Sequence, residues 1–244
     1  CANCSSTAEA MLLPELRRQV LEANLELVRR GLVLFTFGNA SGISREKGLV
    51  VIKPSGVPYE RMKPADLVVS DLDGKIVEGK LRPSSDLPTH LILYKAFPGI
   101  GGVSHTHSEY ATAWAQARRP IPCFGTTHAD TFHGPVPVTA ELKDAEIAED
   151  YEANTGHSIV RTFRDADYSA IPGVLVANHA PFAWGPDAMA SAHNAAVLEF
   201  VARMAYFTLG INSQASAIGR SLHDKHFLRK HGKDAYYGQP KEKK

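Results

Sequence analysis

The segment over residues 101–107 constrains this chain most, because it is an apolar stretch that ends in two histidines one residue apart. The alternation after Ile100 predicts a β-strand, in which residues two positions apart point to the same face. Two residues of a strand rise about 6.6 Å, so the imidazoles of His105 and His107 can tip toward one metal ion. The same pair also fits a polar strand end that faces solvent, since so short a motif recurs by chance.

A second apolar segment, residues 173–179, also ends in a histidine, His179. Two strands that both end in histidine are expected to meet at one edge of a sheet, where loops carry function over a rigid scaffold. His179 is therefore the third candidate ligand. Catalytic zinc sites usually take three protein ligands and keep one position open for water or substrate.

The composition favours one large soluble domain. A chain of 244 residues with 44% hydrophobic residues can bury roughly 70 to 75% of its unfolded surface. The net charge is +1 and no basic stripe precedes Lys241, which argues against nucleic acid or a membrane surface as a partner. No apolar run approaches the roughly 18 residues of a membrane span, so we expect a cytoplasmic protein.

The sequence contains no repeat, low-complexity block or linker that would divide the domain. We predict a disordered leader or extension over residues 1–10, a single domain over 11–239 and a basic tail over 240–244. The three cysteines, Cys1, Cys4 and Cys123, are too few and too unevenly placed for a disulfide framework.

Helices and strands alternate along the predicted domain. The expected helices, recognised by apolar spacing and start or stop signals, cover residues 14–30, 88–97, 108–114, 141–156, 187–209 and 215–230. Besides the two histidine strands, strand ends are expected within 35–42, 50–56 and 122–130, with a hairpin over 67–77.

Two of these strand ends run into turns of small residues, Gly38-Asn39 and Ser55-Gly56. Glycine, serine and asparagine let an anion approach the backbone N–H groups, so such turns can cradle a phosphate. A plain turn is the alternative interpretation of each.

Two carboxylates stand out in polar positions. Ser84, Ser85 and Asp86 begin a helix, and a helix start attracts anions through its free N–H groups and the positive end of its dipole. Asp86 therefore either caps the helix or faces the metal. Asp130 follows a polar corner and is either a general base or an ordinary turn residue.

Five motifs, taken in order, resemble the L-ribulose-5-phosphate 4-epimerases, a family in the metal-dependent class II aldolase and epimerase superfamily that also holds the adducin head. The motifs are Ser84-Ser85-Asp86, His105-Thr106-His107, Thr127-His128-Ala129-Asp130, residues 179–185, and residues 224–232 with 235–239. The match runs over residues 11–239. Each motif alone is weak, but their shared order and spacing are specific.

The resemblance implies a three-layer α/β/α sandwich around a mixed, largely antiparallel central sheet, with the site at a sheet edge. It also implies a metal held by His105, His107 and His179, with Asp86 close by as a fourth ligand or as a base. We expect one divalent ion per subunit, zinc in the first place, with manganese or cobalt as alternatives.

Substrate and proton-transfer positions follow from the same resemblance. The implied phosphate contacts are Gly38, Asn39, Lys53, Ser55, Gly56, Ser84 and Ser85. Asp130 would be one acid or base and Tyr237 the other, with Tyr237 reaching into the site of a neighbouring subunit in a homotetramer. Thr126, Glu152 and His226 match family positions near the site.

The implied isomerase reaction converts L-ribulose 5-phosphate to D-xylulose 5-phosphate, a step used in both arabinose and ascorbate breakdown. The C4 hydrogen is not adjacent to the C2 carbonyl, so the C3–C4 bond must break instead. A divalent metal on the C2 and C3 oxygens would stabilise the enediolate formed by this retro-aldol cleavage. The glycolaldehyde phosphate fragment would rotate its aldehyde and be attacked on the opposite face.

The sequence departs from the family pattern around His179, where the usual His-Ser-His-Gly reads residues 177–180 as Ala-Asn-His-Ala, and after Asp130. Ala177 stands where an accessory histidine is usual, and Thr131 and His133 stand where tyrosines are expected, which would alter the pocket wall. None of these changes removes a proposed ligand.

Three rival functions remain open on the sequence. They are an aldolase that releases its fragments, a non-catalytic module of the adducin kind and a metal-dependent hydrolase. Asp86, where the aldolases carry glutamate, favours the epimerase, and the three histidines argue against a non-catalytic module. The sequence lacks a His-Glu-x-x-His motif that would indicate a hydrolase.

Overall fold

A seven-stranded sheet forms the middle layer of the protein, in the order β4-β3-β2-β1-β5-β7-β6. The strands are β1 (Asn39–Ser44), β2 (Leu49–Ile52), β3 (Val68–Asp71), β4 (Ile76–Glu78), β5 (Gly102–His105), β6 (Gly173–Leu175) and β7 (Pro181–Gly185). The computed structural model describes residues 11–238. The predicted leader 1–10, Gln239 at the end of the predicted domain and the tail 240–244 lie outside the described residues.

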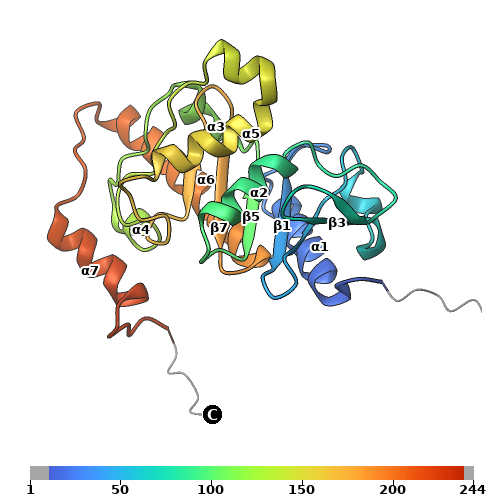
Figure 1. The fold of residues 1–244 in the computed structure, drawn as a ribbon. Coiled ribbons are helices and arrows are strands. Elements are labelled where there is room, and N and C mark those ends of the chain that lie inside the picture. Colours follow the sequence, from blue (N-terminus) through green and yellow to red (C-terminus); the bar gives the residue numbers. More distant parts are fainter. Residues whose placement is uncertain (1–10, 239–244) are drawn as a thin grey trace, which may run out of the picture.

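Seven α-helices and two short 3₁₀ helices surround this sheet in the described chain (Figure 1). The α-helices are α1 (Pro14–Arg29), α2 (Leu87–Ala96), α3 (Glu109–Gln116), α4 (Thr126–Ala129), α5 (Asp144–Thr162), α6 (Ala188–Ile211) and α7 (Arg220–His231). The 3₁₀ helices are η1 (Tyr59–Arg61) and η2 (Pro64–Asp66).

The two faces of the sheet bury separate hydrophobic cores. On one face α1 and α6 pack together and against the strands, with Val20 and Leu27 of α1 beside Val51. On the other face α2 and α5 pack together, and Tyr94 of α2 lies in one core with Trp184 of β7. Apolar stripes on helices that lie against both faces of a sheet produce the predicted three-layer sandwich, which is confirmed.

Two glycines allow the histidine-bearing strand to lie close under the start of α6. A Cβ atom at Gly101 would lie 2.0 Å from the carbonyl oxygen of Pro186, and one at Gly102 would lie 2.3 Å from that of Asp187. Only glycine fits so close an approach of two backbone segments. The glycine pair before His105 is therefore a packing requirement of β5.

The C-terminal helix lies at one end of the molecule, beyond α4 (Figure 1). Within the described residues α7 buries none of its side chains, and it contacts α4 rather than the sheet. Helix α7 is therefore held to the rest of the described chain mainly by polar contacts.

Several element predictions need correction. Every strand pair among the described residues is antiparallel, and parallel pairing is limited to one bridge between Val138 and Leu175. The strand end expected within 122–130 is wrong, because Ile121 makes only a single bridge with Val136 and Pro122 cannot donate to a ladder. That segment instead turns into α4.

Two strand boundaries also differ from the sequence prediction. Asn39 begins β1 instead of following a strand, because Gly38 adopts a positive φ of 78° that redirects the chain just before it. Strand β7 was not predicted at all. Its five residues are buried on both faces, so they show no alternation of polar and apolar residues.

The search for spanning segments in residues 11–238 gave none, since each helix there is too short or too polar to cross a bilayer.

Candidate active site

The ends of three strands meet where the predicted ligands lie. Strand β5 ends at His105, which pairs with Asn39 at the start of β1 on one side and with Phe182 of β7 on the other. His179 lies in the turn between β6 and β7, at this same end of the sheet. The antiparallel register therefore places residues 39, 105 and 179 at one edge.

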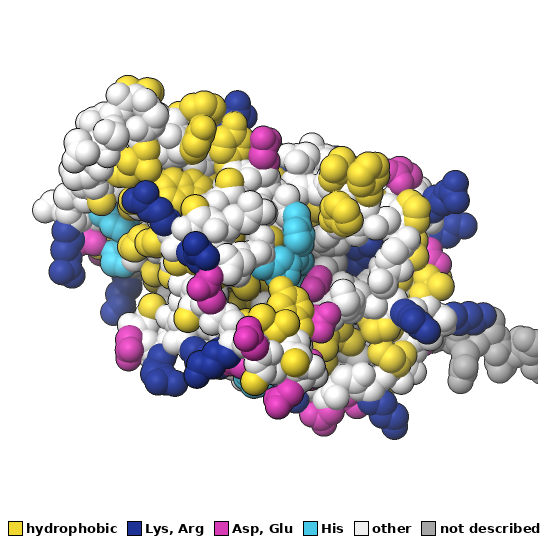
Figure 2. Space-filling view, turned by 90° about the horizontal axis from the view of Figure 1, so that it is seen from above, with side chains coloured by type: hydrophobic (Ala, Val, Ile, Leu, Met, Phe, Trp, Pro, Cys, Tyr) yellow, Lys and Arg dark blue, Asp and Glu magenta, His cyan; other side chains and the backbone are white. Residues whose placement is uncertain are grey.

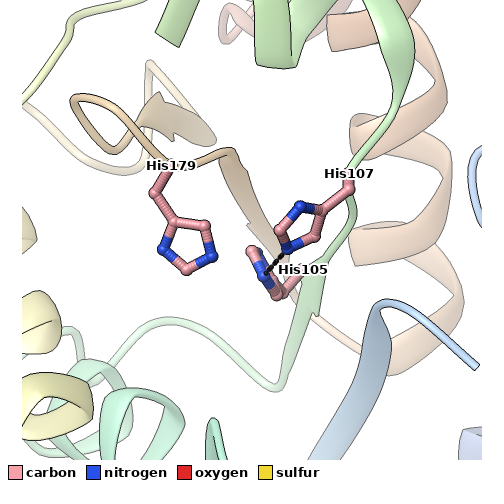
Figure 3. Close-up of side chains that lie close together, drawn as sticks. All are labelled: His105, His107 and His179. Carbon is pink, nitrogen blue, oxygen red and sulfur yellow. Dashed lines mark hydrogen bonds between the residues drawn. The ribbon is translucent and has the colours of Figure 1, made fainter. Parts of the chain in front are cut away.

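The three predicted histidine ligands form one cluster. One ligand atom from each of His105, His107 and His179 lies within 4.8 Å of the others. Figure 3 shows the three rings turned toward a common centre, with the Nε2 atoms of His105 and His107 3.1 Å apart. His107 lies beyond the end of β5, so the loop and not the strand pleat positions its ring.

Hydrogen bonds determine the tautomer of His105. Its Nδ1 lies 3.0 Å from the Pro181 carbonyl oxygen, which can only accept, so Nδ1 carries the proton and Nε2 keeps its lone pair. The ring also stacks on Phe182, with centroids 4.1 Å apart. A metal-binding histidine usually donates a hydrogen bond from one ring nitrogen to a carbonyl or carboxylate and binds the metal through the lone pair of the other.

Burial disfavours the protonated forms of His107 and His179. Burial, with a smaller effect of His105, lowers the pKa of His107, and burial together with His105 and His107 lowers the pKa of His179 to about 4. Metal binding requires neutral imidazoles. Three imidazoles turned toward one centre therefore fit a divalent metal.

Asp86 is held at the cavity by side chains from other elements. Its carboxylate accepts hydrogen bonds from Asn39 Nδ2 at 2.6 Å and Ser84 Oγ at 3.4 Å, and in the described chain it does not cap α2. Burial raises the pKa of Asp86, but the imidazoles of His105 and His90 and the Asn39 amide outweigh burial and lower it. Asp86 is thus a preformed anion near the histidines.

One cavity of about 370 Å³ joins the histidine cluster to the predicted phosphate contacts. It is bordered by Thr36, Phe37, Gly38, Asn39, Lys53, Pro54, Ser55, Gly56, Ser84, Ser85, Asp86, His105, His107, Tyr151, Glu152 and His179. Figure 2 shows histidine side chains beside a hollow in the middle of one face of the molecule. All eleven ligand and phosphate positions named from the sequence border this one space.

Lys53 places a buried amine in the cavity wall. The residue is 2% exposed, its Nζ donates to the Pro54 carbonyl at 3.2 Å, and it lies 4.7 Å from the centre of the Tyr59 ring. Burial lowers its pKa to about 8, so the amine is mostly charged at neutral pH. Among residues 11–238 it forms no ion pair, which leaves its charge available to an anion.

Asp130 and Tyr237 lie together, but the described residues that border the cavity include neither of them. Asp130 accepts hydrogen bonds from Arg229 at 2.8 Å and from His226 at 3.1 Å, and Lys230 lies 3.4 Å away. Burial raises its pKa, but the hydrogen bonds from Arg229 and His226 outweigh burial and lower it. The Tyr237 ring lies under Arg229 and Lys230 and is 61% exposed.

Two of the further positions that matched the family, Glu152 and His226, lie in different places, one at the cavity and one in the cluster around Asp130. Glu152 borders the cavity, whereas His226 belongs to the Asp130 cluster. The altered residues Thr131 and His133 are not among the described residues of the cavity wall, and His133 pairs with Asp224 of α7. These two altered residues therefore lie outside the wall of this cavity.

Tyr151 is a cavity residue that the sequence did not identify. Its hydroxyl lies 2.9 Å from Nδ1 of His179, whereas the sequence predicted only that Tyr151 lies in a helix over residues 141–156. The sequence did hold one signal, Asp150, because aspartate inside a helix can bond to the backbone and interrupt it. Helix α5 breaks at this residue, which has φ −150° and ψ 81°.

Comparison with known proteins gives relatives over nearly the whole chain. Residues 18–206 match the family described as the Class II Aldolase and Adducin N-terminal domain. Curated relatives named L-ribulose-5-phosphate 4-epimerase UlaF, from Salmonella paratyphi B and Salmonella typhi, are each 56% identical over 227 residues. These alignments cover 93% of this chain and 100% of each relative.

Solved structures share the fold. An L-fuculose 1-phosphate aldolase superposes with a TM-score of 0.74 at 25% identity, covering 87% of this chain and 94% of that one. The L-fuculose-1-phosphate aldolase from Thermus thermophilus gives a TM-score of 0.64 at 21% identity, covering 83% and 98%, and this second likeness concerns the fold alone.

Proposed function

Because this chain belongs to the class II aldolase and adducin N-terminal domain family, we propose that it is a metal-dependent L-ribulose-5-phosphate 4-epimerase. The observation that carries the proposal is one cavity bordered by three histidines, a carboxylate and a buried lysine. The 56% identity to curated 4-epimerases supports the same substrate. The enzyme is an isomerase that inverts C4 of L-ribulose 5-phosphate to give D-xylulose 5-phosphate.

Four residues would hold the metal: His105, His107, His179 and, as a fourth ligand or a base that substrate displaces, Asp86. A divalent ion bound there supplies Lewis acidity to the carbonyl and hydroxyl oxygens of the sugar. Asn39 keeps the Asp86 carboxylate in place through the 2.6 Å hydrogen bond. We expect zinc, with manganese or cobalt as alternatives.

The phosphate end of the substrate would bind in the same cavity. Ser55, Gly56, Ser84 and Ser85 offer hydroxyl and backbone N–H donors, and Lys53 offers a positive charge. Anchoring the phosphate keeps the two-carbon fragment in the cavity after the C3–C4 bond breaks. The fragment can then turn its aldehyde and recombine on the other face instead of escaping.

Proton transfer at the C4 oxygen would fall to Asp130 and Tyr237 of a neighbouring subunit. Asp130 is charged at neutral pH and can accept a proton, whereas a phenol with an ordinary pKa near 10 serves more easily as an acid. Within the described residues neither borders the cavity of its own chain, and Tyr237 is exposed, which supports a site shared between copies. We expect a cytoplasmic homotetramer.

Product analysis by NMR tests the function. Metal-loaded protein incubated with L-ribulose 5-phosphate should give D-xylulose 5-phosphate, and a chelated sample should give none. Free dihydroxyacetone and glycolaldehyde phosphate without the epimer would indicate an aldolase instead. An unchanged substrate in the metal-loaded sample would contradict both activities.

A further inference from the structure

The Tyr151 hydroxyl lies 2.9 Å from Nδ1 of His179, on the side of the ring away from the other two histidines. In Figure 3 one ring nitrogen of His179 faces His105 and His107, and the other faces away from them. We infer that Tyr151 is a positioning residue, which fixes the rotation and the tautomer of His179 for metal binding. The inference rests on the proposed metal-dependent function.

His179 needs such a partner more than His105 does. The His105 ring is held by the Pro181 carbonyl and by stacking on Phe182. His179 lies in a turn closed by its own N–H to the Val176 carbonyl, after Asn178 with φ 61°, and that turn fixes only the backbone. In the described chain Tyr151 is the one hydrogen-bond partner of the His179 ring.

Tyr151 is itself rigidly placed by the break in α5. Asp150 leaves the helical conformation, and its carboxylate accepts the Ala153 N–H at 3.3 Å, which is the contact of an N-cap. Tyr151 therefore begins a new helical stretch. Thr89 of α2 donates to the next carbonyl, that of Glu152, at 2.5 Å and ties this stretch to the neighbouring helix.

The direction of the hydrogen bond decides what His179 can bind. A phenol hydroxyl can donate or accept. If Tyr151 donates to Nδ1, the neutral ring carries its proton on Nε2 and cannot bind a metal through that atom. If Nδ1 donates to the phenol oxygen, Nε2 keeps its lone pair, as it does in His105, and the phenol proton is free to point into the cavity that Tyr151 borders.

Removing only this hydroxyl tests the inference. Metal-free wild type and Tyr151→Phe are titrated with Co²⁺ and Zn²⁺ by calorimetry, without substrate, and the visible spectrum of the Co²⁺ form is recorded. Loss of a hydrogen-bond partner of a metal-binding histidine typically weakens metal affinity about 10- to 100-fold. We expect a loss in that range and an altered Co²⁺ spectrum.

Tyr168→Phe is the matched control, because the Tyr168 hydroxyl accepts the Gly99 N–H at 3.4 Å and does not border the cavity within the described residues. Its metal affinity should equal that of wild type. Equal affinity and an unchanged spectrum in Tyr151→Phe would overturn the inference. Failure of the wild type to bind either ion would instead overturn the proposed function.

A measurement on the unmutated protein covers the case in which Tyr151→Phe does not fold. Long-range ¹H–¹⁵N correlation spectra of the Zn²⁺-loaded wild type report which imidazole nitrogen carries a proton. We expect the proton of His179 on Nδ1, in a hydrogen bond. A proton on Nε2, or an Nδ1 proton that exchanges as freely as one exposed to solvent, would refute the role of Tyr151.

Discussion

At the scale of single residues, Lys53 is a buried cation that forms no ion pair within residues 11–238. An ammonium group that is buried without a counter-ion loses hydration and gains little in return, as its lowered pKa of about 8 indicates. Such a cost is acceptable where a bound anion supplies the missing charge. In the proposed function, Lys53 would lower the stability of the free protein and raise its affinity for the phosphate.

Replacing Lys53 by methionine should separate these two effects. A hydrogen bond to a charged group is worth roughly 1.5 to 3 kcal/mol, so we expect the KM of Lys53→Met for the sugar phosphate to rise about 10- to 100-fold. The free energy of unfolding, measured in urea without substrate, should stay equal or rise. Lys95→Met, at an exposed residue paired with Asp73, serves as the control. A lower stability with an unchanged KM would contradict a phosphate role.

At the scale of elements, α5 consists of two helical stretches, before and after Asp150, that face different surroundings. The stretch before Asp150 carries an exposed, charged face, and the stretch after it brings Tyr151 and Glu152 to the cavity. Asn154 bridges the break by donating to the Glu146 carbonyl at 2.8 Å. The break is therefore a defined corner and not a frayed end.

Removing the cap at this corner should loosen the second stretch. Replacing an N-cap aspartate by alanine costs about 1 kcal/mol, and we expect Asp150→Ala to lower the free energy of unfolding by that amount. Amide hydrogen exchange should rise at residues 151–155 most of all. Asp165→Ala, outside the helix, is the comparison variant, and uniform exchange across α5 in both variants would argue against a local cap.

At the scale of the whole molecule, the positions of Asp130 and Tyr237 would determine which subunit mixtures of the proposed oligomer can be active. Both residues contact Arg229 of the same chain, so a neighbouring site would receive both from one subunit. Mixing Asp130→Asn with Tyr237→Phe subunits should therefore restore nothing. The informative mixture combines a subunit with a damaged cavity and a subunit with a damaged cluster.

Mixed oligomers of His105→Asn and Tyr237→Phe should regain activity that neither variant has alone. In a closed homo-oligomer assembled at random from equal amounts, about one quarter of the shared sites receive an intact cavity and an intact cluster. The activity is measured after joint refolding and compared with each variant refolded by itself. Mixtures no more active than their components would refute a shared site.

Buried neutral histidines make the stability of the molecule depend on pH. Burial lowers the pKa of His90 to about 3 and that of His128 to about 4, from an ordinary value of 6.5. Below pH 6.5 the unfolded chain binds more protons than the folded one, so the free energy of unfolding falls as the pH decreases toward these values. The contribution is complete above pH 6.5.

We expect the free energy of unfolding in urea to drop by about 1 to 2 kcal/mol per buried ring between pH 6.5 and 5. His128→Gln should flatten this dependence, and His193→Gln, at a ring whose side chain is 54% exposed, should not. A stability that stays constant over this range would show that these rings are not held neutral.

The sequence by itself determined the succession of helices and strands, and its resemblance to a known family implied the three layers and the residues of the cavity. Apolar stripes, Pro14 and Pro88 at helix starts, and strands ending in histidine are local signals, because each depends on spacing along a few turns or one strand. The eleven residues predicted as metal ligands or phosphate contacts come from the motifs between Ser84 and His179, the two small-residue turns and Lys53. All eleven border the cavity. Their roles remain predictions until the variants are measured.

Only the tertiary structure decided which of these residues act together. The pairing of β1 with β5 sets Asn39 beside His105, and the break in α5 sets Tyr151 against His179. The docking of α7 on α4 gathers Asp130 and Tyr237 away from the cavity of their own chain. These contacts join residues 28 to more than 90 positions apart, and such long-range pairings depend on how whole elements pack, which local sequence patterns do not encode.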